Sequence, residues 1–190
     1  MTEALQIIRN EHRNIAQALA CLDIATRDLR ASDTKPDLEL LFTVVYYMRL
    51  FPGRLHHPKE EHYLFAALSQ RDPAAKETVD NLLREHEAGE DALATIEHAL
   101  KHYDRHYPHG LDALETAVRE YLDLERRHMK NEEEVVFPLA RHCLTDEDWK
   151  EIDNAFAKNA LSLFTDNLAI GFQGLRHRIN EMLKMAHPPA

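Results

Sequence analysis

The chain has 190 residues, enough for one domain with a substantial apolar core, and its formal net charge is -10. This acidity argues against nucleic acid as a partner, because phosphate binding requires a basic face. Only five glycines, together with abundant Leu, Ala and Glu, favour an all-α fold. Cys21 and Cys143 stand singly in helical contexts, so we expect reduced thiols and neither a disulfide nor a thiolate metal site.

Residues 1–10 show neither the basic start nor the long apolar stretch of a signal peptide. No segment approaches the roughly 18 continuous apolar residues that a membrane span requires. We therefore expect a cytoplasmic protein that contacts no membrane.

The first predicted helix runs from about Thr2 to Leu29, because apolar residues recur there at intervals of three and four. His12 falls on this apolar stripe, one turn from Ile8 and from Ile15. A hydrogen-bonded core histidine and a metal ligand are both consistent with that position.

The second helix is expected to begin near Asp37, after a polar connection, and to be broken or kinked at Phe51-Pro52-Gly53. His56 and Glu60 follow as a His-x-x-x-Glu unit with Pro58 inside it. The helix should therefore bend or restart close to His56.

The third helix is predicted to start at Asp72-Pro73, which is a helix-start signal. His86 lies on its apolar stripe, and Glu90 follows four residues later, with Gly89 between them. Further along, His98, His102 and His106 are also spaced by four, but few aliphatic residues flank them, and we expect a solvated face.

The fourth helix is predicted from about Leu111 to Arg141. Its apolar seam carries ionisable residues in the middle; it consists of Leu114, Val118, Tyr121, Glu125, His128, Glu132, Val135 and Leu139. Burying an unpaired carboxylate costs several kcal/mol. A cation bound by His128 and Glu132 would compensate that cost; a buried His–Glu hydrogen bond and a seam that faces water are the alternatives.

After Cys143 the pattern changes. Thr145 followed by an acidic turn predicts the start of a short helix through Ile152 and Phe156, and a last amphipathic helix is expected around residues 172–183. We expect this extension, residues 143–190, to cover the domain formed by residues 1–142 or to form the surface of a homodimer.

One motif occurs twice and organises the chain. When Phe65 is aligned with Phe137, the segments 55–65 and 127–137 match in their histidine, in two glutamates and in an apolar pair. On a helix, residues four apart lie on one face with Cβ atoms about 5–6 Å apart. Each copy can therefore direct an imidazole and a carboxylate at one metal-sized point.

Four amphipathic segments with short connections predict an antiparallel up-down four-helix bundle, a common setting for metal sites. Each helix offers one inward histidine: His12, His56, His86 and His128. With Glu60 and Glu132 added, this inventory exceeds the needs of one tetrahedral ion and suits two ions with bridging carboxylates. The absence of thiolates and the mixture of imidazole and carboxylate favour iron or manganese over structural zinc, although affinity alone does not exclude zinc or copper.

These residues resemble the hemerythrin-like, HHE cation-binding domain family, across about residues 5–142. The resemblance rests on the order of one His, a His-x-x-x-Glu, one His and a second His-x-x-x-Glu. Glu85-His86 and Ala88-Gly89-Glu90 are similar to bacterial members, some of which are linked to repair of iron–sulfur centres under nitrosative stress. The resemblance implies two iron ions with an oxo or hydroxo bridge, four terminal histidines, and bridges from Glu60 and Glu132.

The sequence departs from the oxygen carriers of that family at one position. Their third helix supplies two histidines four apart, whereas here the second is Glu90, which could bind iron, leave a site open to water or accept a hydrogen bond. Reversible oxygen carriage is therefore not implied. His57 with Glu61 forms an alternative register for the first pair; we rank it second because only His56 and Glu60 align with the second copy.

Three functional hypotheses follow. The first is a di-iron protein that binds or reacts with dioxygen, nitric oxide or hydrogen peroxide at an open iron position. The second is an iron sensor, store or donor, including a role in iron–sulfur repair. The third is a helical interaction protein with satisfied core histidines, which the duplicated motif disfavours.

Overall fold

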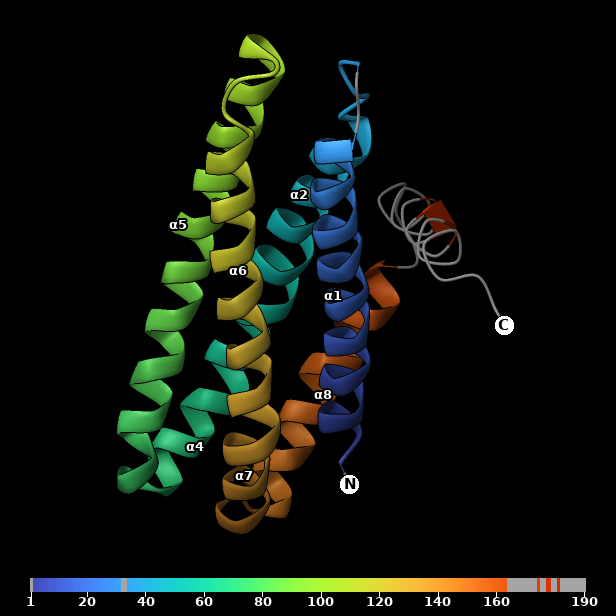
Figure 1. Cartoon of the computed structure of the whole chain (residues 1–190). Helices are drawn as coiled ribbons and strands as arrows, with labels where there is room; N and C mark the ends of the chain where they lie inside the picture. Colours follow the sequence, from blue (N-terminus) through green and yellow to red (C-terminus); the bar gives the residue numbers. More distant parts are fainter. Residues whose placement is uncertain (1, 32–33, 164–173, 175–176, 179–180, 182–190) are drawn as a thin grey trace, which may run out of the picture.

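Four antiparallel helical rods lie side by side in the computed structural model, and a further helix packs along the outside of them (Figure 1). The structure describes residues 2–31, 34–163, 174, 177–178 and 181. Within these residues there is no β-strand, so the predicted all-α bundle is confirmed. The last predicted helix, around residues 172–183, lies outside the described residues apart from isolated positions.

The first and third rods are simple. Helix α1 (Glu3–Asp28) forms the first rod and ends in a 3₁₀ turn, Leu29–Ala31. Helix α5 (Lys76–His106) forms the third, preceded by the 3₁₀ turn Pro73–Ala75. The Asp72 carboxylate accepts a hydrogen bond from the Ala74 N–H at 2.9 Å, which confirms the predicted start signal.

The second and fourth rods each contain stretches of wider, π-helical winding. The second comprises α2 (Glu39–Phe51), a π segment Pro52–His56, α3 (His57–Lys59), a π segment Glu60–Phe65 and α4 (Ala66–Arg71). The fourth comprises α6 (Leu111–Asn131), a π segment Glu132–Val136 and α7 (Phe137–Cys143). Gly110 opens α6 with φ of 97°, where a Cβ would lie 2.7 Å from the His102 ring.

The interruption predicted at Phe51-Pro52-Gly53 takes the form of a change in winding, because α2 ends at Phe51 and the π segment begins at Pro52. Pro52 lacks an N–H, and the chain absorbs it with a wide turn in which the His57 N–H donates to the Pro52 carbonyl, five residues back. The rod therefore continues through His56.

The π segments also shift the buried face by one residue. The segments Glu60–Phe65 and Glu132–Val136 begin at a motif glutamate, and the apolar pairs that follow these glutamates, Leu64-Phe65 and Val136-Phe137, are at most 1% exposed. Val135, which the regular spacing placed in the core, is 43% exposed. The extra residue of the wide turn explains this error, because it rotates the following helix relative to an uninterrupted 3.6-residue repeat.

Two apolar clusters fill the bundle on either side of the histidine positions. One contains Ile15 and Leu19 of α1 and residues of α2, α5 and α6; the other contains Leu5 and Ile8 of α1 and residues of α4, α5, α7 and α8. Because His12 lies between Ile8 and Ile15, the level of the bundle that contains the histidines lies between two apolar regions.

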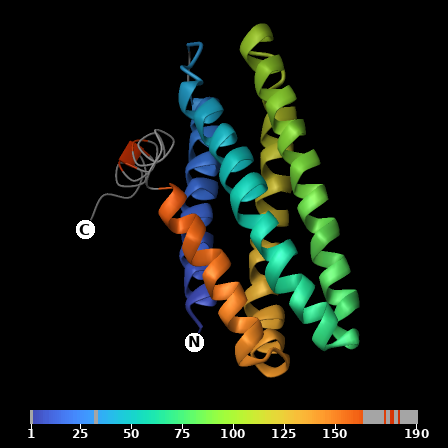
Figure 2. The same ribbon diagram turned by 180° about the vertical axis from the view of Figure 1, so that it is seen from behind.

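Helix α8 (Asp146–Leu163) lies against α1 and the second rod (Figure 2). Thr145 and Asp148 bond reciprocally at its start, as the predicted N-cap requires. Its buried side chains Ile152 and Phe156 enter the second apolar cluster, and the Ala4 N–H donates to Asp153 Oδ1 at 2.7 Å.

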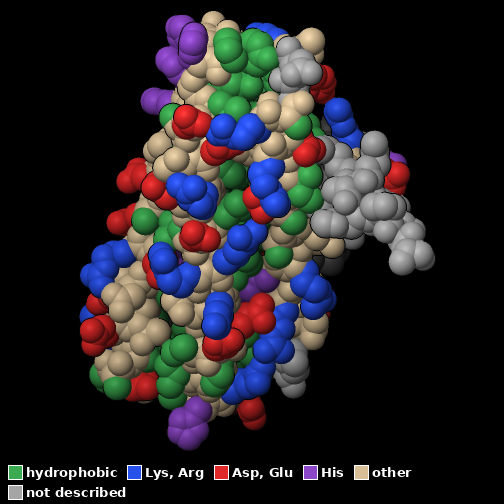
Figure 3. All heavy atoms as spheres, viewed as in Figure 1, with side chains coloured by type: hydrophobic (Ala, Val, Ile, Leu, Met, Phe, Trp, Pro, Cys, Tyr) green, Lys and Arg blue, Asp and Glu red, His purple; other side chains and the backbone are tan. Residues whose placement is uncertain are grey.

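The surface carries positive and negative side chains interspersed (Figure 3). Histidines gather at the end where α5 meets α6; His98, His102 and His106 are exposed, as predicted. Within the described residues, every helix is too short or too polar to traverse a lipid bilayer.

Candidate metal centre

Six of the seven predicted side chains converge in the middle of the bundle: His12, His56, Glu60, His86, His128 and Glu132. They come from all four rods, and none is more than 5% exposed. Glu90 stays outside the groups that they form.

The six side chains form two groups that share Glu60 and Glu132. On one side, His12 Nε2 lies 3.1 Å from Glu132 Oε2, and His56 Nε2 lies 3.4 Å from Glu60 Oε1. On the other side, His128 Nε2 lies 3.5 Å from Glu132 Oε2, and His86 Nε2 lies 3.9 Å from Glu60 Oε2. Both carboxylates therefore stand between two pairs of imidazoles.

Each of the four imidazoles has a second carboxylate at its Nδ1, on the side away from this centre. The pairs are His12–Glu133 at 2.9 Å, His56–Glu11 at 2.8 Å, His86–Glu61 at 2.7 Å and His128–Glu85 at 3.1 Å. An Nδ1–H that donates to a carboxylate leaves the Nε2 lone pair free to face the centre. Each Nε2 is thus directed at the centre, where it can bind a metal once it carries no proton.

These four acceptors were not identified as such from the sequence, although a signal was present. Glu11 and Glu85 directly precede a histidine, and Glu61 and Glu133 directly follow a motif glutamate. Each of them serves a histidine of another rod. Adjacency alone could therefore not reveal the pairing.

Glu11 is the most buried of the four acceptors. It also accepts a hydrogen bond from Lys59 Nζ at 2.7 Å, and Lys59, 4% exposed, lies 4.8 Å from the ring centre of Phe156 in α8. His56 and Lys59 together outweigh the effect of burial and lower the pKa of Glu11. Helix α8 thus closes the protein over this ion pair.

Without a cation, the pKa values of the two central carboxylates, Glu60 and Glu132, shift in opposite directions. Burial and the nearby charge of Glu132 raise the pKa of Glu60 well above its usual value. Burial alone would also raise the pKa of Glu132, but His128 and His12 outweigh it and lower that pKa to about 2. Without a cation, burial therefore opposes the presence of a negative charge on both carboxylates at once.

The unpaired atoms of the centre test whether a metal fits. Among the described residues, both oxygens of Glu60, both oxygens of Glu132 and His12 Nε2 are buried without a hydrogen-bond partner. A buried polar atom left in this way costs about 1–3 kcal/mol, and more when it is charged. Glu60, Glu132 and His12 belong to one potential ligand group, and carboxylate oxygen with imidazole nitrogen is a donor set for first-row transition metals. The residues fit a pair of such cations.

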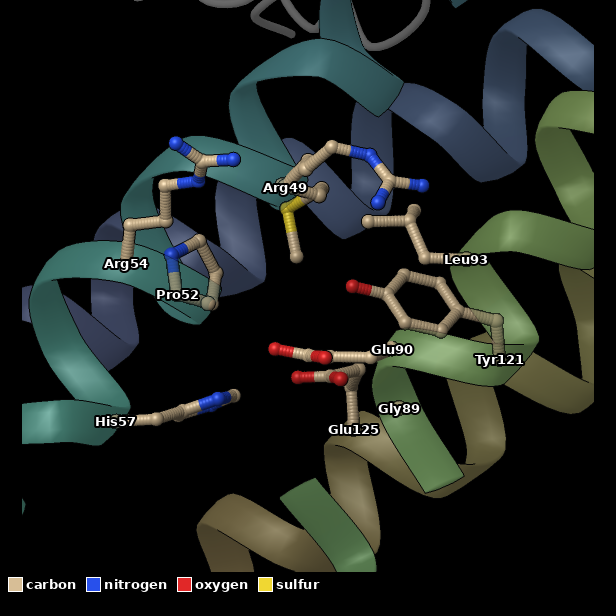
Figure 4. Close-up of a pocket in the computed structure, with 11 residues that line it drawn as sticks. Arg49, Pro52, Arg54, His57, Gly89, Glu90, Leu93, Tyr121 and Glu125 are labelled. Carbon is tan, nitrogen blue, oxygen red and sulfur yellow. The ribbon is translucent and has the colours of Figure 1, made fainter. Parts of the chain in front are cut away.

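A small cavity of about 140 Å³ adjoins the centre between the second rod, α5 and α6 (Figure 4). Glu90, which is exposed at residue level, points into it, together with Tyr121 and Glu125. Burial raises the pKa of Glu125 to about 7. A Cβ at position 89 would lie 2.9 Å from Glu125 Oε1, so Gly89 leaves room for that carboxylate.

His57 and Glu61, the alternative pair, do not act together: Glu61 accepts a hydrogen bond from His86, and His57 stacks on the His86 ring. The His57 ring is 7% exposed and stacks on His86 with ring centres 3.8 Å apart; burial, followed by the charge of His86, lowers its pKa well below the usual value. His57 also forms a third potential ligand group with His86 and His128.

A helical bundle with buried His and Glu groups of this geometry defines a metal-binding helical protein. The family model described as hemerythrin HHE cation binding domain matches residues 3–140, and the chain therefore belongs to the hemerythrin family. A search of curated proteins finds no match.

Proposed function

We propose that this protein holds two iron ions and binds or reacts with a small ligand, namely dioxygen, nitric oxide or hydrogen peroxide, at an open iron position. The observation that carries the proposal is the pair of ligand groups that share Glu60 and Glu132. Iron in such a centre supplies exchangeable coordination positions and one-electron redox chemistry.

The side chains divide the work in this proposal. Glu60 and Glu132 would be shared by the two ions, with His12 and His56 as further ligands on one side and His86 and His128 on the other. The Nδ1 carboxylates fix the ring orientations and increase the basicity of the imidazoles. The apolar clusters on either side exclude bulk water, and the cavity beside Glu90 and Glu125 gives a small polar molecule a route to the centre.

Reconstitution tests the proposal. Metal-free protein loaded anaerobically with Fe²⁺ should retain about two irons per chain after desalting, and charge-transfer absorption should develop on exposure to air, nitric oxide or peroxide. A stoichiometry clearly below two, or an unchanged spectrum with all three ligands, would refute it.

A matched pair of variants identifies the centre as the binding site. Glu132→Gln removes a bridging charge without changing the shape of the side chain and should abolish retention of both irons. Glu134→Gln removes an exposed carboxylate two residues further on and should retain both. Equal iron contents in the two variants would mean that the iron is bound elsewhere.

The second candidate is an iron sensor, store or donor. It is favoured by the buried oxygens of Glu60 and Glu132, which have no hydrogen-bond partner among the described residues and so couple metal occupancy to the stability of the bundle. Sensing through stability requires the melting temperature to rise with Fe²⁺ concentration. An apo form that melts at the same temperature as the loaded form would exclude it.

A further inference from the structure

His56 and His57 are consecutive, yet both are buried, at 1% and 7% exposure. Neighbouring residues of a regular α-helix point about 100° apart, which normally directs only one of them at a given site. The π segment that ends at His56 widens the helix immediately before this pair. Both imidazoles thus enter the interior from the same turn.

His57 lies on the His86 side of the centre, where its ring stacks on that of His86; because the lone pairs of stacked rings do not converge, sharing an ion requires the His57 ring to turn out of the stack. Its ring is nearly parallel to that of His86, at an interplanar angle of 10°, and edge-on to that of His128, with ring centres 5.6 Å apart. One nitrogen from each of the three rings lies within 4.8 Å of the others. Three imidazoles around one point match the preference of divalent transition metals for this donor.

Glu90 is the competing donor for this position. It follows His86 by one helical turn, but it is exposed at residue level and lies outside the three potential ligand groups of the described residues. In Figure 4 its carboxylate lies across the cavity from the His57 ring.

We propose that His57 is a third imidazole ligand of the cation held by His86 and His128. This rests on the proposed two-ion centre and makes its halves unequal: one ion receives three imidazoles and the other, at His12 and His56, receives two. Both share Glu60 and Glu132.

Cobalt titration of the metal-free protein tests the proposal, because Co²⁺ reports both the number of bound ions and, through its visible absorption, their coordination. His57→Phe keeps a ring against His86 but has no nitrogen; His57→Ala removes the ring. The matched control is His62→Ala, an exposed histidine of the same rod, and Glu90→Gln tests the competing donor. Circular dichroism of each metal-free variant verifies the fold.

We expect wild type and His62→Ala to bind two Co²⁺ ions with the same affinities, and Glu90→Gln to lose less affinity than either His57 variant. In both His57 variants one ion should bind at least about tenfold more weakly, since even indirect partners of a ligand contribute that much. The absorption of the weakened ion should change as well. Millimolar free imidazole should restore the affinity of His57→Ala through the adjoining cavity, which a purely structural role for the ring does not predict.

The remaining outcomes contradict the proposal in distinguishable ways. Wild-type affinity for both ions in His57→Phe would show that the ring only stacks. Weakening in Glu90→Gln but not in His57→Phe would assign the position to Glu90. If wild type itself binds fewer than two ions, the two-ion centre fails, and the role of His57 fails with it. Should His57→Ala not fold, His57→Phe decides between these outcomes.

Discussion

Replacing Glu125 by Gln should stabilise the metal-free protein at neutral and alkaline pH but not at acidic pH. Glu125 is 4% exposed, and its Oε2 has no hydrogen-bond partner among the described residues. Burial raises the pKa of this carboxyl from 4.5 to about 7. Gln has nearly the same shape, can still accept a hydrogen bond from Tyr121 and never ionises.

The sign and size of the effect follow from the two pKa values. Between pH 4.5 and about 7 the folded protein keeps the Glu125 proton while the unfolded chain has lost it. The free energy of unfolding of the wild type therefore falls through this range and levels off above it. A gap between pKa values of 4.5 and about 7 corresponds to about 3 kcal/mol. The variant lacks this loss.

Urea unfolding in the presence of a chelator measures the effect, at intervals from below pH 4.5 to above pH 8. The stability of Glu125→Gln relative to wild type should increase by about 3 kcal/mol across the range. Glu120→Gln, an exposed position on the same helix, should stay within about 0.5 kcal/mol of wild type throughout. A pH-independent difference between Glu125→Gln and wild type would refute the assignment of a buried, neutral carboxyl.

Three further predictions concern the metal centre and the core beside it. Burial lowers the pKa of His12, but Glu132 and Glu133 outweigh the effect of burial and raise that pKa to about 9. Because a cation must displace the His12 proton, each fall of one pH unit below pH 9 should weaken cation binding by up to about tenfold. Calorimetry measures the affinity at each pH, and an affinity that does not change with pH would contradict this. Glu11→Gln should weaken cation binding by about 10–100-fold, which a metal titration measures. Because Lys59 stays buried without its anion, the same change should lower the free energy of unfolding by roughly 3–5 kcal/mol, which urea unfolding measures. Wild-type values in both measurements would contradict these expectations. Phe137→Ala, at a fully buried ring, should cost roughly 3–5 kcal/mol in urea unfolding; a loss below 1 kcal/mol would mean that the core collapses around the deletion.

The sequence was sufficient to predict the rods and to select the six central side chains, because both depend on local helical spacing. A histidine and a glutamate four residues apart share a helix face whatever the rest of the chain does. The repetition of that unit in two apolar contexts identified His56, Glu60, His128 and Glu132. His12 and His86 followed from their places on apolar stripes.

The features that could not be predicted depend on winding and on contacts between rods. A uniform 3.6-residue repeat cannot reveal the wide turn that begins at Glu132 and exposes Val135. Nor can spacing show that Glu85, the neighbour of His86, accepts instead from His128, 43 residues away. Such pairings depend on how four rods are rotated against one another.

The metal-free centre also explains how so many acids fit inside a folded protein. Six carboxylates surround it, yet Lys59 is the one buried cationic side chain among the described lysines and arginines. Protons compensate part of the rest, since the pKa values of His12 and Glu60 are both raised. Cations that enter must displace such protons, so part of the positive charge that loading brings replaces charge already present. The stability of the empty bundle and its affinity for cations should therefore both depend on pH.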